Sequence, residues 1–267
     1  MSKGMLVDTT RCIGCRGCQV ACKSWNDLDA EKSGFSESGS NPPRLKANTF
    51  TRVVFRDVAL ADGGVKSVFV KSQCMHCNEP ACATACPVGA LQKSKDGPVT
   101  YDADKCMGCR YCMVACPFNV PKFEWSSVTP KIRKCTFCAD RQAAGKAPAC
   151  ASTCPAQAIL YGERGDLVRE AHRRIDASPG KYAPTVYGEA TAGGTSVMYL
   201  TAIPFEALGM EADGFRADLG TLPYGRASEQ WMAGVPLVAL TMGGLALGLY
   251  SLNQRKSDVE QAEGKGG

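Results

Sequence analysis

Histidine is nearly absent from this sequence, which contains only two, His76 and His172, among its 267 residues. A transmembrane b-type haem needs two axial histidines, so we do not expect this chain to hold one alone. The G-x-G-x-x-G run, the P-loop and the G-x-S-x-G turn are missing as well, which removes the usual sites for dinucleotides, nucleoside triphosphates and serine nucleophiles. These absences predict a chain without a catalytic site of its own.

Cysteine, by contrast, is abundant, and none of the sixteen residues lies outside a motif. The first and third of four quartets read C-x2-C-x2-C-x3-C, the spacing of bacterial ferredoxins, and the other two are stretched forms of it. A cubane [4Fe–4S] cluster needs four thiolates, so the pattern predicts four clusters and an electron-transfer function. In chain order the quartets are Cys12, Cys15, Cys18 and Cys22; Cys74, Cys77, Cys82 and Cys86; Cys106, Cys109, Cys112 and Cys116; and Cys135, Cys138, Cys150 and Cys154.

The same spacing predicts that the quartets exchange ligands. In two-cluster ferredoxins the fourth cysteine of a run binds the other cluster of the pair. The second and third quartets are neighbours in the chain, so they should form one pair, and the first and fourth should form the other. We therefore expect four metal sites: Cys12, Cys15 and Cys18 with Cys154; Cys135, Cys138 and Cys150 with Cys22; Cys74, Cys77 and Cys82 with Cys116; and Cys106, Cys109 and Cys112 with Cys86.

Structural zinc and disulfide bonds are the alternative uses of such cysteines. Paired C-x2-C motifs bind zinc, and the fourth quartet alone allows this interpretation. Three cysteines at successive two-residue gaps, with a fourth three residues later, are not a zinc pattern, and cysteines this close in sequence are poor disulfide partners. His76 lies inside the C-M-H-C run of the second quartet. Because cysteines already complete the ligand count, we expect it near a cluster but not as a ligand.

The formal net charge of +5 counts every cysteine as neutral. A thiolate-bound cubane carries about −2 when oxidised, so four of them would bring the total to about −3. We interpret the basic side chains beside the ligand runs as charge compensation for the clusters, with ordinary solvated surface as the alternative. Contacts with nucleic acid are not expected. These side chains are Lys105, Arg110, Lys131, Arg133 and Lys134.

The expected fold is α+β, with two bacterial-ferredoxin-like modules that each hold two cubane clusters, loop insertions, and one C-terminal transmembrane helix. Module A, with quartets one and four, would combine residues 1–28 with residues 131–165. Module B, with quartets two and three, would span residues 72–130. Residues 29–71 would form an insertion between them, because this stretch opens with a Ser/Gly/Pro-rich run typical of a loop.

Local patterns predict further elements outside the ligand runs. Alternating β-branched and aromatic residues at 49–58 and 65–71 flank an Asp-Gly-Gly turn and indicate a hairpin. Residues 159–164 predict a short strand, and residues 167–177 predict a helix. The rest of the stretch 166–228 has little periodicity and much Gly and Pro, so we expect an extended arm that contacts partner subunits.

Near the C-terminus, residues 231–252 contain no charged side chain. This length suffices to cross a bilayer as a helix, so residues 229–253 are interpreted as a single transmembrane helix and residues 254–267 as a polar tail. Trp231 and Tyr250 lie near the two ends of the stretch, where aromatic side chains favour the membrane interface. A buried core helix is the alternative interpretation.

Charges around this stretch predict its orientation in the cytoplasmic membrane. Arg255 and Lys256 follow it directly, and Arg226 precedes it, so the positive-inside rule places the C-terminus in the cytoplasm and the cluster domain in the periplasm. The N-terminus has no apolar segment typical of a cleavable signal, so we expect export as a folded complex with a twin-arginine signal on a partner. Gly244 and Gly248 form a G-x-x-x-G face suited to a helix of a multi-span partner.

The motifs resemble those of a known family. The run C-I-G-C-R-G-C-Q-V-A-C-K-S-W-N-D at residues 12–27, followed by S-N-P-P, is most similar to formate dehydrogenase beta subunits, and the single C-terminal span resembles the formate dehydrogenase-N type. Residues 187–200 and 204–209 are also similar to the corresponding subunit of periplasmic [NiFe] hydrogenases. The resemblance covers nearly the whole chain and implies that all sixteen cysteines bind clusters.

The resemblance also implies partners. A catalytic subunit with a Mo- or W-bis-molybdopterin guanine dinucleotide site would oxidise formate and pass electrons through the four clusters to a membrane cytochrome b that reduces quinone. The same relay role in a quinone-linked [NiFe] hydrogenase, or in another molybdoenzyme of the superfamily, is the alternative. A zinc-binding, membrane-anchored scaffold is a remote alternative of a different class.

Overall fold

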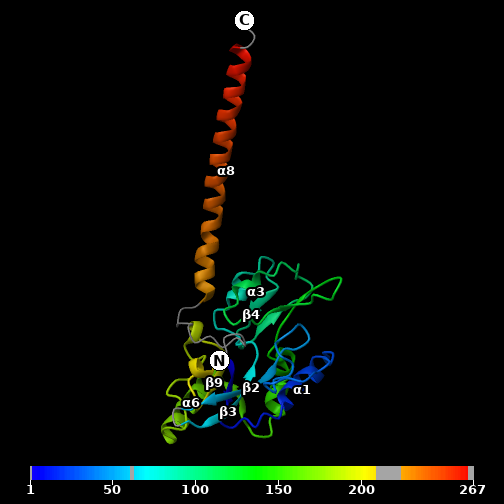
Figure 1. The fold of residues 1–267 in the computed structure, drawn as a ribbon, viewed down its shortest axis with the longest axis vertical. Helices are drawn as coiled ribbons and strands as arrows, with labels where there is room; N and C mark the ends of the chain where they lie inside the picture. Colours follow the sequence, from blue (N-terminus) through cyan, green and yellow to red (C-terminus); the bar gives the residue numbers. More distant parts are fainter. Residues whose placement is uncertain (1, 61–62, 209–223, 264–267) are drawn as a thin grey trace. The chain divides into compact units, whose positions relative to one another are not determined.

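Short strands and short helices joined by long loops make up most of the chain in the computed structural model, which describes residues 2–60, 63–208 and 224–263 (Figure 1). The chain divides into two units, Met1–Arg226 and Ala227–Gly267. The strands are β1 (Lys3–Asp8), β2 (Arg52–Ala59), β3 (Val65–Ser72), β4 (Leu91–Lys93), β5 (Val99–Tyr101), β6 (Lys122–Phe123), β7 (Ile132–Arg133), β8 (Ile159–Glu163) and β9 (Val197–Leu200). The helices are α1 (Gly17–Trp25), α2 (Ala81–Thr84), α3 (Tyr111–Ala115), α4 (Ala139–Ala143), α5 (Ala149–Ser152), α6 (Arg164–Ala177), the 3-10 helix η1 (Thr191–Gly193), α7 (Phe205–Leu208) and α8 (Tyr224–Glu263).

A three-stranded sheet with the order β8-β1-β9 has β1 at its centre. Because β1 runs antiparallel to β8 and parallel to β9, Val7 lies opposite Ile159 on one side and Tyr199 on the other. Met5 and Val7 pack into the core that contains the largest group of cysteines, whereas Leu6 packs into a separate core with α6. Alternate side chains of a strand point to opposite faces, so both faces of this sheet are covered.

Helix α6 covers the face of the sheet that points away from the cysteines. Its Leu167 and Ala171 are four residues apart, which places both on one side of the helix, and both are buried against Leu6 of β1. The predicted strand and helix in this region are both confirmed, although the helix begins at Arg164 instead of three residues later. The sheet is therefore held between α6 and the cysteine-rich core.

Strands β2 and β3 form the predicted hairpin and pair antiparallel along their whole length. Val54 and Val70 face each other in this register and are completely buried. A hydrogen bond of 2.8 Å from the Leu60 N–H to the Gly64 carbonyl closes the turn. Asp62 of the predicted turn lies outside the described residues. The hairpin is the largest element between the first and second quartets, and it extends into the cysteine-rich core.

Each quartet places its third cysteine on a short helix. Helix α1 carries Cys18, α2 carries Cys82, α3 carries Cys112 and α5 carries Cys150. Helix α1 packs against α5, and α2 packs against α3. The helix of the first quartet is therefore a neighbour of the helix of the fourth, and the helices of the second and third quartets are neighbours too.

The structure differs from the extended arm expected over 166–228. Strand β9 lies in this stretch, pairs with β1, and all four of its residues are buried. A short strand covered on both faces has no alternation of apolar and polar residues, so the sequence pattern did not reveal it. Residues 209–223 lie outside the described residues, and contact between this stretch and partner subunits stays a prediction.

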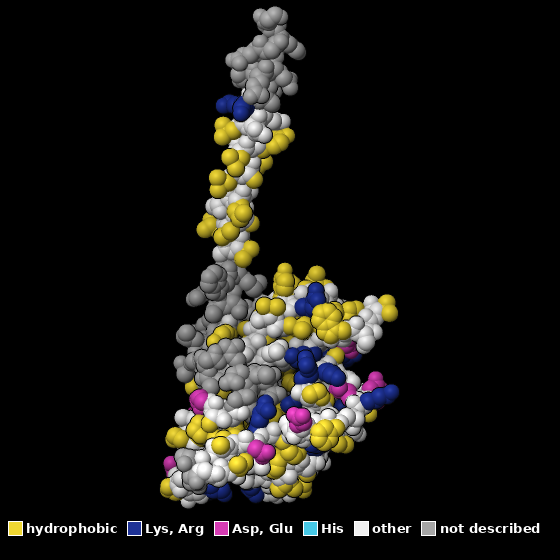
Figure 2. Space-filling model, in the orientation of Figure 1, with side chains coloured by type: hydrophobic (Ala, Val, Ile, Leu, Met, Phe, Trp, Pro, Cys, Tyr) yellow, Lys and Arg dark blue, Asp and Glu magenta, His cyan; other side chains and the backbone are white. Residues whose placement is uncertain are grey.

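Helix α8 contains the expected membrane span. Within the described residues it is the one helix that is long and apolar enough to cross a membrane, and the qualifying segment is Gly234–Lys256. None of this segment is buried, and Figure 2 shows hydrophobic side chains along the helix. The side chain of Trp231, an expected interface residue, lies outside the described side chains. Length and composition are consistent with a single membrane pass.

Candidate iron–sulfur centres

Cysteines from the first and fourth quartets meet in one cavity, and we call these four residues group I. Its members Cys12, Cys15, Cys18 and Cys154 line a space of about 390 Å³, counted with the part open to solvent. Val7 of β1 lies in the wall of this cavity. The sheet therefore contacts group I through the face opposite α6.

A second cavity, lined by group II, lies on the same face of the sheet. Group II combines Cys22 of the first quartet with three cysteines of the fourth, and its cavity measures about 310 Å³ with the open part included. Met5 of β1 lies in its wall, as Val7 lies in the wall of group I. The two cavities thus rest on neighbouring inward-facing positions of one strand. The members of group II are Cys22, Cys135, Cys138 and Cys150.

Groups III and IV combine the second quartet with the third. Group IV lines a cavity of about 310 Å³, open part included, with the apolar residues Leu91 and Ile132 in its wall. In group III the four thiols are close enough to influence one another: burial, then the thiolates of the other three members, raises the pKa of Cys77 well above its ordinary value. Group III is Cys74, Cys77, Cys82 and Cys116, and group IV is Cys86, Cys106, Cys109 and Cys112.

The structure places twelve of the cysteines in three cavities, each lined by one of the sets that ligand exchange predicts, and the effect of Cys74, Cys82 and Cys116 on the pKa of Cys77 relates the other four. In every set three members come from one quartet, and the fourth is the last cysteine of its partner quartet. Four thiols around a common space provide the donor set of a cubane cluster. The binding of iron by these sets stays a prediction.

The four groups lie in series. Groups I and II are joined by α1, which contributes one cysteine to each. Groups III and IV are joined in the same way by α3 and the residue after it. Between the two pairs, Cys135 of group II and Cys74 of group III belong to the same buried core, and the Cys74 thiolate adds to the effect of burial in raising the pKa of Cys135. The resulting order is I, II, III, IV.

The residue before the second cysteine of each quartet has a left-handed backbone. It is Gly14 in the first quartet and Gly108 in the third, with φ of 67° and 74°. In the second and fourth quartets it is His76 and Phe137, with φ of 49° and 58°. This conformation costs a residue with a Cβ atom roughly 1–2 kcal/mol. The repetition at four independent positions indicates that the C-x2-C turn around each group requires it.

His76 and Phe137, the two residues with a Cβ atom in this left-handed conformation, contact each other. The rings of His76 and Phe137 stack with centroids 4.7 Å apart and planes at 18°. This stack joins the C-x2-C loop of group III to that of group II. The Nδ1 atom of His76 accepts a hydrogen bond of 2.9 Å from the Val99 N–H, and burial keeps the pKa of His76 well below its ordinary value. His76 is therefore neutral, and with Nδ1 accepting, its proton lies on Nε2.

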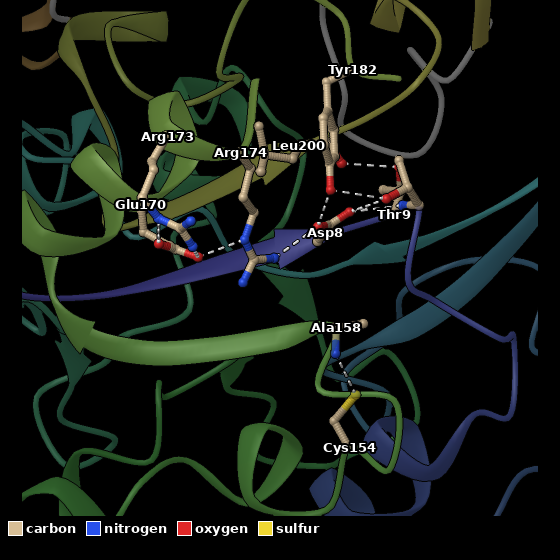
Figure 3. Close-up of polar contacts among 10 residues, drawn as sticks. Asp8, Thr9, Cys154, Ala158, Glu170, Arg173, Arg174, Tyr182 and Leu200 are labelled. Atoms are coloured by element: carbon tan, nitrogen blue, oxygen red, sulfur yellow. Dashed lines mark hydrogen bonds and ion pairs between the residues drawn. The ribbon is translucent and has the colours of Figure 1, made fainter. Parts of the chain in front are cut away.

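Backbone N–H groups point at several of the cysteine sulfurs. The Ala158 N–H donates to Sγ of Cys154 at 3.3 Å (Figure 3), and the Ala90 N–H donates to Sγ of Cys86 at 3.2 Å. Each donor lies four residues after a cysteine that is followed by proline. The proline ends the helical turn, and the chain then bends back towards the sulfur. Hydrogen bonds of this kind to ligand sulfurs are one of the factors that set cluster potentials.

A network around Asp8 fixes the turn that leads from β1 into group I (Figure 3). Asp8 is fully buried, and its Oδ2 accepts hydrogen bonds from Arg174 of α6 at 2.8 Å and from the Tyr182 hydroxyl at 3.0 Å. Its Oδ1 accepts from the N–H and hydroxyl of Thr10. Since Cys12 follows two residues after Thr10, this network holds the first ligand of group I in place.

Sequence patterns missed two lysines near these groups, the buried Lys71 and the half-buried Lys93. Lys71 is 2% exposed and lines the cavity of group I. Lys93 donates to the carbonyls of His76 at 3.0 Å and Gly97 at 2.7 Å. Lys71 and Lys93 both lie outside the ligand runs. No sequence pattern distinguishes a buried lysine at the end of a strand from an exposed one. Lys134, which the sequence did single out, is buried as well.

The other basic residues singled out from the sequence lie outside the core. Lys105 pairs with Asp102 at 3.1 Å, and Arg133 pairs with Glu124 at 2.6 Å, so carboxylates already balance both charges. Arg110 lies over the rings of Phe123 and Trp125, and Lys131 donates to the carbonyls of Ala103 and Cys106. Most of the basic residues beside the ligand runs therefore serve local structure.

Burial makes many of the thiols weak acids in the metal-free chain. It raises the pKa of Cys22 and of Cys112 to about 12, and that of Cys116 to about 11. Because only thiolates bind iron, loading the groups must release protons. For Lys71, burial lowers the pKa, but neighbouring thiolates, with Cys150 the largest contributor, raise it above its ordinary value.

Exposed apolar side chains surround groups I and IV, the two ends of the series. Ile13 and Val20 lie beside cysteines of group I and are 61% and 66% exposed. Met107, Tyr111 and Val114 lie beside cysteines of group IV, and Val114 is 88% exposed. Clusters of exposed apolar side chains mark interaction sites more often than isolated ones do.

Comparison with known proteins identifies the family. Residues 65–164 match the model of the 4Fe-4S dicluster domain. The whole sequence is 46% identical over 268 residues to a protein of Nitratidesulfovibrio vulgaris (strain Hildenborough), a match that covers 98% of this chain and 70% of that protein. The chain belongs to the 4Fe-4S dicluster family of iron–sulfur electron-transfer subunits.

Two named relatives in this family serve different enzymes. The hydrogenase-2 operon protein HybA of Escherichia coli O157:H7 is 37% identical over 239 residues, which is 78% of this chain and 72% of the relative. The iron–sulfur subunit of the nitrate-inducible formate dehydrogenase of Escherichia coli (strain K12) is 37% identical over 198 residues, which is 73% of this chain and 66% of the relative. The family is therefore that of subunits in formate dehydrogenase- and hydrogenase-type complexes.

Ligand exchange gives a prediction about single cysteines. Cys154→Ser should disturb the cluster of group I, although Cys154 belongs to the fourth quartet. The electron paramagnetic resonance (EPR) difference spectrum of the reduced complex should then match that of Cys15→Ser and differ from that of Cys138→Ser. A match between Cys154→Ser and Cys138→Ser instead would show that the quartets keep their own fourth cysteines.

The left-handed turns give a second prediction. Gly14→Ala should lower the stability of the assembled protein by roughly 1–2 kcal/mol, since a Cβ atom at Gly14 would also lie 3.1 Å from Phe69 Cδ1. Thermal unfolding followed by circular dichroism, with iron content measured in parallel, would test this. Gly34→Ala is the control, because nothing lies within 4 Å of its added Cβ atom. Equal unfolding temperatures for the two variants would show that the turn tolerates a side chain.

Proposed function

We propose that this chain holds four [4Fe–4S] clusters, one in each of groups I to IV, and relays electrons along that series. The observation that supports this most strongly is that three cavities are each lined by four cysteines, three from one quartet and the last one of its partner quartet. When bound, the clusters supply one-electron carriers. The chain supplies the thiolates, the N–H groups that point at sulfur, and an apolar wall that keeps water away.

The cofactor fits the residues present. Every group offers four thiols, which suits iron–sulfur clusters, and apolar side chains such as Val7, Met5 and Leu91 form part of the cavity walls. The ligand set proposed for each cluster is its group. Membership of the 4Fe-4S dicluster family also argues against the zinc scaffold considered as a remote alternative.

We place the clusters in two ferredoxin-like modules. Module A would hold groups I and II on residues 1–28 and 131–165, and module B would hold groups III and IV on residues 72–130. The packing of α1 on α5 and of α2 on α3 supports this division. The stack of His76 on Phe137 would then be a contact between modules, at the point where electrons pass from one to the other.

The partners proposed for the two ends of the series are an enzyme and a membrane protein. We favour a Mo- or W-bis-molybdopterin guanine dinucleotide formate dehydrogenase subunit at one end, of the formate dehydrogenase-N type, and a multi-span cytochrome b with a quinone site at the other. Exposed apolar residues beside groups I and IV, such as Ile13 and Val114, support docking at both ends. A [NiFe] hydrogenase is the second candidate, since the hydrogenase-2 relative matches more of this chain, 78% against 73%.

We also propose that α8 anchors the chain in the cytoplasmic membrane as a single pass. Its exposed apolar segment, Gly234–Lys256, has the length that a bilayer requires. Arg255 and Lys256 at the end of this segment favour a cytoplasmic C-terminus, which places the cluster domain in the periplasm.

Metal analysis of the intact complex tests the function. The complex, extracted in mild detergent through a tag on this chain, should contain about sixteen iron atoms per chain in addition to those of its partners. Molybdenum or tungsten together with reduction of the clusters by formate would establish the formate dehydrogenase assignment. Nickel, with reduction by hydrogen and not by formate, would assign the chain to a hydrogenase. Zinc in place of iron would reject the relay altogether.

Reporter fusions test the orientation. A fluorescent protein that matures in the cytoplasm should be bright when fused after residue 267, and alkaline phosphatase, which needs the periplasm, should be inactive there. The two reporters give opposite results for the same topology, so each is the control for the other. Active phosphatase with a dark fluorescent protein would reverse the proposed orientation.

A further inference from the structure

A buried ammonium group lies in the wall between groups I and II. Lys71 is 2% exposed and lines the cavity of group I. Its Nζ donates a hydrogen bond to Oε1 of Gln73, and Gln73 lines the cavity of group II. One lysine therefore reaches both cavities, directly on one side and through a single amide on the other.

Strand geometry fixes the lysine in this position. Lys71 lies opposite Val53 in the register of β2 and β3, and both residues line the cavity of group I. The carbonyl of Lys71 accepts a hydrogen bond of 2.7 Å from the hydroxyl of Tyr199, which comes from the central sheet. The amide of Gln73 is oriented in turn, because its Nε2 lies 3.4 Å from Sδ of Met5 and leaves Oε1 for the lysine.

Within the part of the chain that the structure describes, the charge of Lys71 has no protein partner of opposite sign. An ammonium group has three N–H donors, and among the described residues Lys71 has one acceptor, a neutral amide oxygen, and no carboxylate. Lys134 and Lys93 differ, since each donates to at least two carbonyl or hydroxyl oxygens. Burying an ion is strongly unfavourable unless a counter-charge lies nearby. For Lys71 the remaining neighbours are the two cysteine groups.

We propose that Lys71 is the shared counter-ion of the clusters in groups I and II and raises the reduction potential of both. The inference rests on the proposed function, in which each group holds one cluster. A cluster becomes more negative by one charge when it is reduced, so a fixed cation beside it stabilises the reduced form. Lys71 carries no electrons itself. It makes reduction of the clusters in groups I and II more favourable relative to those in groups III and IV.

The test replaces the charge and measures potentials instead of turnover. Lys71→Met keeps most of the side-chain volume, and redox titration of the purified complex followed by EPR reports each cluster. Two of the four clusters should shift to lower potential, and their spectra should be those lost in Cys15→Ser and Cys138→Ser. Lys66→Met is the matched control, because Lys66 lies on the same strand but is exposed. It should leave all four potentials unchanged.

Three results would overturn the proposal: unchanged potentials in Lys71→Met, an equal shift of all four clusters, or a shift confined to groups III and IV. Iron content separates this failure from failure of the proposed function. A wild-type complex with four clusters and no shift in Lys71→Met rejects the counter-ion alone. A wild-type complex with fewer clusters rejects the relay on which it rests.

A second variant covers the case in which Lys71→Met does not assemble. Gln73→Glu keeps the lysine and almost the same shape, but it places a carboxylate on the ammonium group. The cluster of group I should then fall in potential too, although Gln73 does not line that cavity, because its counter-ion has been neutralised. A fall confined to the cluster of group II would show that the new carboxylate acts alone and would reject a role for Lys71.

Discussion

The antiparallel pairing of β1 with β8 is the interaction on which the cysteine arrangement depends. Cys12 and Cys154 are separated by most of the cysteine-bearing sequence, yet group I needs them around one cavity. Val7 lies opposite Ile159 in the register of β1 and β8. Cys12 follows Val7 in the chain and Cys154 precedes Ile159, so both cysteines lie at the same end of the sheet. The Asp8 network then holds the turn into Cys12. This strand pair therefore brings together the chain segments that supply groups I and II.

Buried charge is the second theme of the structure. Apolar side chains exclude water from the wall of group I, yet this wall contains the buried Lys71. The hydrogen-bond partner of Lys71 is the amide oxygen of Gln73 and not a carboxylate. Exposed basic residues nearby, such as Arg133 with Glu124, are already paired within the chain. The distinction matters because paired surface charges contribute little to a buried centre, whereas an unpaired buried charge acts on it through a low dielectric.

Much of this arrangement could be predicted from spacing alone, since cluster ligands are set by covalent distances along the chain. The hairpin of β2 and β3 follows from a short-range pattern, and the grouping of Cys22 with Cys150 follows from ligand exchange once the neighbouring second and third quartets are paired. Strand β9 could not be predicted, because its pairing with β1 is a long-range contact and its burial on both faces erases alternation. The role of Lys71 and the left-handed Phe137 were equally hidden, since both depend on tertiary neighbours.

Ligand sharing across the chain also sets an order in time. During synthesis, the cysteines of groups III and IV are all present once residue 116 has been made, whereas group II remains incomplete until residue 150 and group I until residue 154. Local contacts form faster than those that close long loops, and chains emerge from the N-terminus. In the proposed arrangement, groups III and IV therefore become competent for metal first, and groups II and I follow. Assembly then starts at the III–IV end of the series and ends at group I, which combines the first and the last cysteines of the chain.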